Sequence, residues 1–312
     1  VRGERREHNC QRLKDLTLVA LETGQFIQGD HKCADRRVVG EVLDVEPSIE
    51  DPEMPETVED HRGVVEFDHV SFSYPDAEKE VLEDISFTAG PGRTTAIIGG
   101  TGSGKSTLIS LIPRFYDATE GSVRVDGKDV REITQHELRD QIGYVPQKGL
   151  LFSGTIASNL QYGKEDATEA EMLEAAETAQ AMDFIREKEH GLDEEVAQGG
   201  TNVSGGQKQR LSIARALVKK PKIYIFDDSF SALDFKTDKA LREALKEKVG
   251  DSTIIIVAQR INTIIDADQI LVLDEGRLAG KGTHDELMET CDVYREIALS
   301  QLSEEELERG RK

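Results

Sequence analysis

The chain has 312 residues, with 39 Lys and Arg against 61 Asp and Glu, which gives a formal net charge of −22. This length suffices for one large domain or two small ones with a core that needs no disulfide or metal support. Because so acidic a surface repels polyanions, we expect no nucleic-acid partner.

The three cysteines, Cys10, Cys33 and Cys291, lie far apart and form no paired metal spacing. They fit a reducing compartment in which thiols are buried or inert. No apolar run approaches the ~18 residues of a membrane span, and no apolar segment of signal-peptide type follows residues 1–10. The sequence as given predicts a soluble, unsecreted chain.

The first 62 residues predict a charged segment and linker rather than a compact fold, because residues 46–63 combine Pro, Glu and Asp. We expect the compact domain to span residues 63–300. Residues 301–312 are acidic and then basic, which is typical of a solvated helix end.

Strand patterns begin at Val64. Residues 64–75 alternate in polarity, and residues 80–100 give a strand, a Pro-Gly turn and a short apolar run that ends in glycines. Farther along, three short β-branched runs show no alternation, as expected of parallel strands covered on both faces. These runs are "KIYIFDD" (222–228), "STIIIVAQ" (252–259) and "QILVLDEG" (269–276).

The region between these strand groups, about residues 148–218, predicts a helical insertion. Thr168 and Glu171 are spaced as a capping box at the start of one helix. One apolar face of that helix indicates plain packing. The face consists of Met172, Ala175, Ala176 and Ala179.

The segment "GGTGSGKST", residues 99–107, fits the phosphate-binding pattern G-x-x-x-x-G-K-[ST] between an apolar strand and a helix. Its glycines let backbone N–H groups turn toward phosphate oxygens, and the following helix directs its positive end at them. Lys105 would reach the β and γ phosphates, and Ser106 would hold Mg²⁺. The predicted ATP contacts here are Gly99, Thr101, Gly102, Ser103, Gly104, Lys105, Ser106 and Thr107.

Two further motifs narrow the range of reactions that the phosphate-binding loop alone leaves open. "IYIFDD" ends an apolar strand in Asp227, which we predict holds Mg²⁺, and in Asp228. "VSGGQ" precedes a helix that bears Arg210 and Arg215, and Ser204 and Gln207 are spaced as its capping box. Glycines in that first turn favour close approach of the backbone to an anion.

The ordered motifs over about residues 64–300 resemble the nucleotide-binding domain of ATP-binding cassette (ABC) transporters. They are "FSYPD" with Tyr74, the phosphate-binding loop, "GYVPQKGLLFSGTI" with Gln147, "VSGGQ", "IYIFDDSFSALD" and "IIIVAQRINTI" with Gln259. The stretch before "VSGGQ" and the "FSGTI" segment resemble the exporter branch. The resemblance implies an α/β fold: a P-loop NTPase (RecA-like) core with a mainly parallel sheet, an antiparallel β subdomain and a helical insertion subdomain.

The resemblance also implies roles. Tyr74 would stack on adenine, and Gln147 would sense Mg²⁺ and couple to a membrane domain. Two such domains would dimerise head to tail, so that each ATP lies between one P-loop and the partner's "VSGGQ". The residues implied in catalysis are Lys105, Gln147, Asp228 and Gln259. Those implied in Mg²⁺ binding are Ser106, Gln147 and Asp227. Those implied in ATP binding across the dimer are Val203, Ser204, Gly205, Gly206, Gln207 and Asp234.

Two departures from the family pattern predict slow turnover. Asp228 stands where the family usually has Glu, and Gln259 stands where it usually has His. Loss of one methylene withdraws a general base by about 1.3 Å, and Gln cannot carry a positive charge into the transition state. "VSGGQ" departs only by Val203 for Leu. The chain therefore resembles the degenerate-site subunit of a heterodimeric exporter, whose partner would hold the fully catalytic site.

Residues 1–17 and 33–47 resemble cytoplasmic flanks of membrane spans, so we expect a transmembrane domain as partner or fusion and a place at the cytoplasmic face of the membrane. Two alternatives stay open: a soluble ABC ATPase that works on DNA or ribosomes, and a non-hydrolysing regulatory module in which ATP only holds a dimer together. His284 and the other histidines lack ligand spacing, so we expect surface or capping roles for them.

Overall fold

The computed structural model describes residues 48–75, 77 and 79–302. Within this range, residues 51–75, 77 and 79–302 belong to one compact unit. The predicted segments at 1–47 and 303–312, with Cys10 and Cys33, lie outside the described residues. Within the described part, no helix is both long and apolar enough to cross a membrane.

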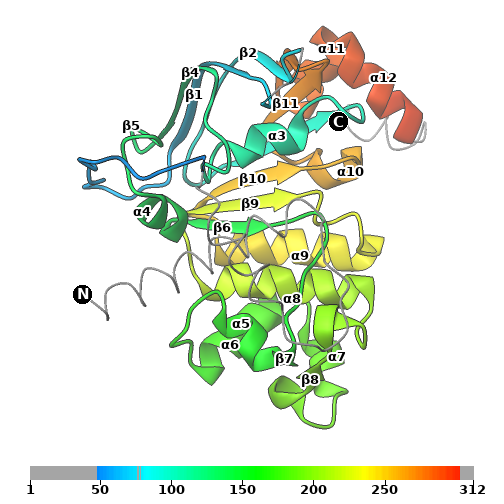
Figure 1. Ribbon diagram of the computed structural model, residues 1–312. Helices are drawn as coiled ribbons and strands as arrows, with labels where there is room; N and C mark the ends of the chain where they lie inside the picture. The colour runs from blue at the N-terminus through cyan, green and yellow to red at the C-terminus, as the bar shows by residue number, and fades with distance from the viewer. Residues whose placement is uncertain (1–47, 76, 78, 303–312) are drawn as a thin grey trace. The chain divides into compact units, whose positions relative to one another are not determined.

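Four strands form an antiparallel sheet in the order β2-β1-β4-β5 (Figure 1). The alternation predicted from the sequence is present over residues 65–68 of β1, and a register shift after Phe67 interrupts it. Phe67 is buried and stacks across the strand pair on Phe87, with ring centroids 4.6 Å apart. Such cross-strand aromatic pairs stabilise a sheet and fix its register. The strands are β1 Val65–Phe72, β2 Leu82–Ala89, β4 Glu120–Val125 and β5 Lys128–Asp129.

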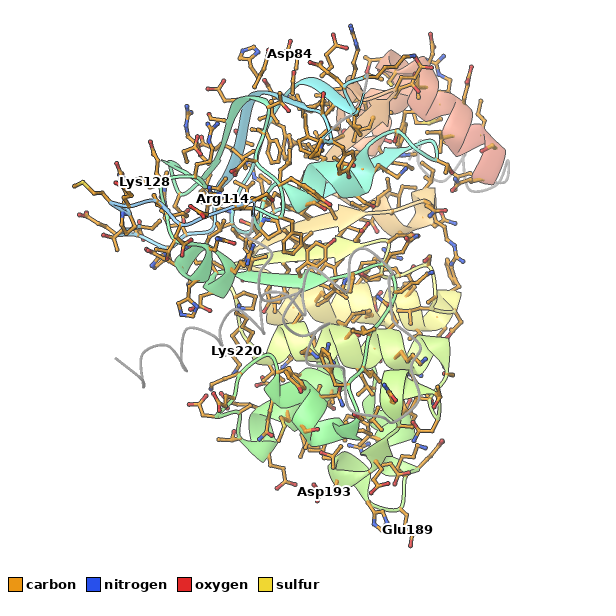
Figure 2. All side chains as sticks on the ribbon, in the orientation of Figure 1. Asp84, Arg114, Lys128, Glu189, Asp193 and Lys220 are labelled. Atoms are coloured by element: carbon orange, nitrogen blue, oxygen red, sulfur yellow. The ribbon has the colours of Figure 1, made fainter. Side chains whose placement is uncertain are left out.

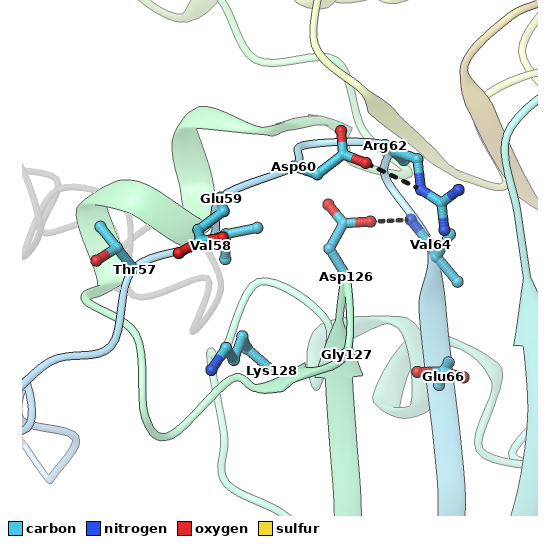
Figure 3. A pocket seen from close by; sticks show the side chains of 10 residues that line it. All are labelled: Thr57, Val58, Glu59, Asp60, Arg62, Val64, Glu66, Asp126, Gly127 and Lys128. Carbon is cyan, nitrogen blue, oxygen red and sulfur yellow. Dashed lines mark hydrogen bonds and ion pairs between the residues drawn. The ribbon is translucent and has the colours of Figure 1, made fainter.

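The segment before β1 runs along this sheet. Asp126 and Gly127 form the β4–β5 turn with φ of 52° and 79°, as a type I′ turn requires. The Asp126 carboxylate accepts hydrogen bonds from the backbone N–H groups of Gly63 (3.1 Å) and Val64 (2.7 Å). This contact holds the chain at the start of β1 beside a surface pocket of about 570 Å³ (Figure 3).

The six-stranded sheet has the order β12-β11-β3-β10-β9-β6, and only β12 is antiparallel to its neighbour. This confirms the mainly parallel sheet. Every residue of β9 and β10 is buried, as predicted for strands covered on both faces. The strands are β3 Thr94–Gly99, β6 Ile142–Val145, β9 Ile223–Asp227, β10 Thr253–Val257, β11 Gln269–Asp274 and β12 Arg277–Gly282.

Helices cover both faces of this sheet (Figure 1). Helix α3 (Lys105–Ser110) lies between the two sheets, and α8 (Gly205–Val218) and α9 (Phe235–Lys248) lie on the opposite face. Each face has its own hydrophobic cluster, because successive residues of a buried strand point to opposite sides. The other helices of this part are α4 Gln135–Asp140, α10 Ile261–Ile264, α11 His284–Thr290 and α12 Asp292–Gln301.

A helical insertion lies between β6 and β9, as the expected fold implies, and its far tip carries Glu189 and Asp193 (Figure 2). Thr168 and Glu171 form the predicted capping box of α6, and the face of Met172, Ala175, Ala176 and Ala179 is buried. Its elements are β7 Gly154–Thr155, α5 Ile156–Gln161, α6 Glu169–Thr178, α7 Met182–Arg186, β8 Glu195–Val196 and the 3₁₀ turns Gly191–Asp193 and Gln198–Gly200.

A buried amide attaches the first part of the insertion to α8. Asn159 is fully buried, and its side chain accepts from Phe152 N–H (2.9 Å) and donates to Phe152 O (2.8 Å). Its Oδ1 also accepts from the Arg215 guanidinium at 2.9 Å. Burial removes the Arg215 guanidinium from water and lowers its pKa to about 10. Its hydrogen bonds to Asn159 and to Leu150 O (3.0 Å) take the place of hydrogen bonds to water.

His284 corrects one sequence expectation. It is buried, and its Nδ1 lies 2.8 Å from the hydroxyl of Tyr294, which joins α11 to α12. The expected surface or capping role was wrong because the partner hydroxyl comes from the next helix, which no local spacing indicates. Burial lowers the pKa of His284. Cys291 is a free, buried thiol, as predicted.

We predict that Asn159→Ala lowers the free energy of unfolding by about 2–4 kcal/mol, because it removes the acceptor of one buried N–H group of the Arg215 guanidinium and of the Phe152 backbone N–H. Urea unfolding followed by circular dichroism measures this loss. Thr168→Ala is the control: it removes an exposed cap of the same insertion and should cost about 1 kcal/mol. A loss no larger for Asn159→Ala than for this control would contradict the prediction.

Candidate functional site

The loop between β3 and α3 has a backbone that only glycine accommodates. A Cβ at Gly99 would lie 2.1 Å from the carbonyl oxygen of Leu273, and Gly102 and Gly104 have φ of 80° and 96°. Gly104 is the N-cap of α3, which begins at Lys105. The sequence therefore forms a loop whose backbone is open to close approach by an anion in front of a helix N-terminus.

Lys105 lies against this loop. Its ammonium donates hydrogen bonds to Gly99 O at 2.9 Å and to Gly100 O at 2.6 Å. Burial lowers the pKa of Lys105, while the nearby carboxylates of Asp228 and Asp227 act in the opposite direction. The loop thus presents one localised positive charge among its backbone amides, which suits phosphate oxygens.

Asp227, the last residue of β9, lies beside the first turn of α3. The Ser106 hydroxyl donates to Asp227 Oδ1 at 3.0 Å, and the Tyr144 hydroxyl donates to Oδ2 at 3.5 Å. Burial raises the pKa of Asp227. A hydroxyl and a carboxylate are oxygen ligands that suit Mg²⁺. Among the described residues, no group of three or more His, Cys, Asp or Glu could hold a metal ion.

Asp228 follows with φ of 45°, a left-handed conformation that non-glycine residues seldom adopt. Its N–H donates to Val257 O at 3.0 Å. Its Oδ2 accepts two amide hydrogen bonds, from Gln147 Nε2 at 3.1 Å and from Gln259 Nε2 at 2.7 Å. Strained backbone at a strand end is typical of functional sites.

These groups converge on one cavity of about 380 Å³ at the carboxyl ends of β3, β9 and β10. Seven predicted site residues beyond the glycines line it: Thr101, Lys105, Ser106, Gln147, Asp227, Asp228 and Gln259. Helix α12 also contributes, through Ile297, Ser300 and Gln301.

Tyr74 lies outside this lining. Its hydroxyl is 3.0 Å from Thr107 Oγ1, and its ring is 36% exposed between edge-on contacts with Phe72 and Tyr116. The ring is therefore held beside the phosphate-binding loop with a large part free to stack on a planar ligand.

The "VSGGQ" residues, Val203–Gln207, also lie outside the cavity lining. Ser204 and Gln207 form the predicted capping box of α8, with Gln207 N–H to Ser204 Oγ at 3.2 Å and Ser204 N–H to Gln207 Oε1 at 3.0 Å. A Cβ on Gly205 would meet nothing within 4 Å. Asp234 caps α9, and hydrogen bonds from Thr237 lower the pKa of its carboxyl. Neither element contributes to this chain's own cavity.

Three side chains at the site were not predicted from the sequence. Tyr144 contacts Asp227, as described above. Gln209 is 1% exposed and donates from Nε2 to Pro146 O at 3.1 Å, which fixes the residue before Gln147. Gln301 contacts the loop that follows β10. Each acts through a contact far along the chain, so no local motif marks it.

Comparison with known proteins agrees with this geometry. The family model described as ABC transporter matches residues 82–231. An uncharacterized ABC transporter ATP-binding protein of Mycobacterium tuberculosis is 50% identical over 91% of this chain and 49% of its own length. A beta-(1→2)glucan export ATP-binding/permease protein of Bradyrhizobium diazoefficiens is 46% identical over 86% of this chain and 44% of its own length.

The fold also has a solved counterpart. The structure of a bacterial Atm1-family ABC exporter with ATP bound matches with a TM-score of 0.80 at 40% identity, over 86% of this chain and 47% of that one. This match confirms the P-loop NTPase fold with its antiparallel β subdomain. The chain spans about half the length of the curated relatives it matches.

We predict that Asp227→Asn raises the melting temperature of the nucleotide-free protein while it weakens Mg²⁺-dependent nucleotide binding. A carboxyl whose folded pKa is raised above 3.8 loses stability as pH rises through the folded value, so the gain from Asn is largest at neutral pH and vanishes in acid. Thermal scans from pH 4 to pH 8 measure the difference. A variant less stable than the wild type at pH 7 would contradict this prediction.

Proposed function

The chain contains an ABC transporter ATP-binding domain, which is an ATPase domain, and from this premise we propose that it powers export across a membrane by ATP-driven dimerisation. The observation that carries the proposal is the single cavity where the phosphate-binding loop, Asp227, Asp228, Gln147 and Gln259 meet. The exporter direction is supported by relatives whose names state export.

The proposed site residues divide the work of phosphoryl transfer. Backbone amides of residues 99–107 and Lys105 bind the phosphates, and Tyr74 stacks on the adenine. Ser106 and Asp227 would hold Mg²⁺ with Gln147 nearby, and bound Mg²⁺ supplies a positive charge that neutralises the β and γ phosphate oxygens. Asp228 orients the attacking water and accepts its proton.

This arrangement supports a slow site. Oδ2 of Asp228 already accepts from Gln147 and Gln259, so only Oδ1 is left for water. The aspartate side chain is also about 1.3 Å shorter than glutamate. Gln259 can hydrogen-bond a γ-phosphate but adds no charge to the transition state. We propose that this chain's own site binds ATP and turns over slowly.

The second half of the proposal concerns partners. Val203–Gln207, at the capped start of α8, lies outside the chain's own cavity, and Ser204 and Gly205 are exposed, so this turn is available to complete a site on another nucleotide-binding domain. That partner would be a different chain with the usual catalytic Glu and switch His. A transmembrane exporter domain, fused or separate, would place the chain at the cytoplasmic face of the membrane.

We predict that Asp228→Glu raises ATP hydrolysis by roughly 10- to 100-fold with little change in nucleotide affinity, because a displacement near 1 Å of a catalytic group costs about 100-fold. Single-turnover hydrolysis of radiolabelled Mg-ATP measures the rate, and a fluorescent nucleotide measures binding. Asp228→Asn is the matched control and should bind nucleotide without turnover.

The outcomes separate the rival readings. Tight binding with slow wild-type turnover supports the degenerate site and directs the search to a catalytic partner. Fast turnover by the wild-type chain alone would replace it with an ordinary homodimeric motor. Nucleotide binding without turnover in the wild type and in both Asp228 variants would show that Asp228 does not act as a base, which leaves the regulatory module. Tight, salt-dependent binding to DNA would instead favour a soluble ATPase.

A further inference from the structure

The loop between β10 and α10 carries Gln259 but has little local support. Helix α10 is only four residues long, and its N-cap residue, Arg260, makes no side-chain capping bond. An arginine side chain has donors only, so it cannot accept from the first N–H groups of the helix. The acceptor must therefore come from elsewhere in the chain.

Gln301 supplies it from 40 residues away. Its Oε1 accepts from Ile261 N–H at 2.9 Å, and its Nε2 donates to Gln259 O at 2.8 Å. One amide thus bridges both sides of Arg260 and fixes two backbone positions of the loop. The Gln301 side chain thus uses its oxygen for one hydrogen bond and its nitrogen for the other. Among the described contacts, neither atom bonds to another side chain.

The bridged loop is the one that positions Gln259. The Gln259 side chain reaches Asp228 Oδ2 at 2.7 Å, and Ile261, next to the bridged N–H, is fully buried. Gln301 itself is exposed and lines the rim of the same 380 Å³ cavity. Its contact therefore lies between the end of α12 and the reacting groups.

We propose that Gln301 is a positioning residue for ATP hydrolysis, which holds the Gln259 backbone so that the Gln259 amide meets Asp228 and the γ-phosphate. Through it, the end of α12 controls the rate at this chain's own site. This role rests on the proposed function and goes beyond it, because Gln301 acts through its contact with the Gln259 backbone.

The first test is a double-mutant cycle on kcat and KM for Mg-ATP in single-turnover and steady-state assays. Gln301→Ala should lower kcat about tenfold with KM unchanged. In a Gln259→Ala background the same change should cost less than twofold, because Gln301 acts through Gln259. Gln301→Glu keeps the acceptor for Ile261 N–H but cannot donate to Gln259 O, so its kcat should lie between those of the wild type and Gln301→Ala.

The second test does not depend on turnover. Hydrogen exchange of the nucleotide-free protein should show faster exchange at the Ile261 amide in Gln301→Ala and near wild-type exchange in Gln301→Glu. Glu296→Ala, an exposed change on the same helix, is the control and should alter neither exchange nor kcat. Equal melting temperatures for Gln301→Ala and this control would exclude a general loss of stability as the cause of faster exchange or lower kcat.

The outcomes are distinct. If the wild-type chain hydrolyses ATP, two results would overturn this role and leave the proposed function intact. One is a Gln301→Ala variant as active as the wild type. The other is a loss of kcat in Gln301→Ala that adds fully to the loss in Gln259→Ala. Unchanged exchange at Ile261 would overturn it as well. A wild-type chain that neither binds nor hydrolyses ATP would overturn the proposed function and this role together.

Discussion

The register of the parallel sheet is the constraint on which the site depends. Val257 pairs with Asp227 on one side and with Ile97 on the other, so β3, β9 and β10 end within two residues of one another. In open α/β sheets the crevice beyond the carboxyl ends of the strands is where ligands bind. The phosphate-binding loop, the two aspartates and Gln259 meet because each lies at, or within two residues after, one of these three strand ends.

The strand register also determines where individual atoms of Asp228 lie. Its N–H still bonds to Val257 of the neighbouring strand, while its positive φ turns the side chain toward the two glutamine amides. A longer side chain at the same backbone position would carry its carboxylate beyond the point where both amides now reach it. The substitutions at 228 and 259 are therefore a matched pair: a short acid and a neutral amide that bond to each other.

Much of this arrangement could be predicted from the sequence, and what could not has a common cause. The glycine loop, the buried strand ending in Asp227 and the capping boxes at Thr168 and Ser204 are local patterns, in which spacing alone determines the geometry. Gln209 and Gln301 depend on contacts 63 and 40 residues along the chain. His284 belongs to the same class, because its partner hydroxyl comes from another helix.

The same long-range contacts join the chain's own cavity to the half-site that it would lend to a partner. Gln209, one turn into α8, holds Pro146 O, and a Cβ on Gly149 would lie 2.8 Å from the backbone of Lys208. The segment around Gln147 is thus packed directly on the start of α8. A displacement of the backbone around Gln147 would therefore either shift the start of α8 or break the hydrogen bond between Gln209 and Pro146 O. Under the proposed function, this packing would let ATP binding at a slow site act on the start of α8.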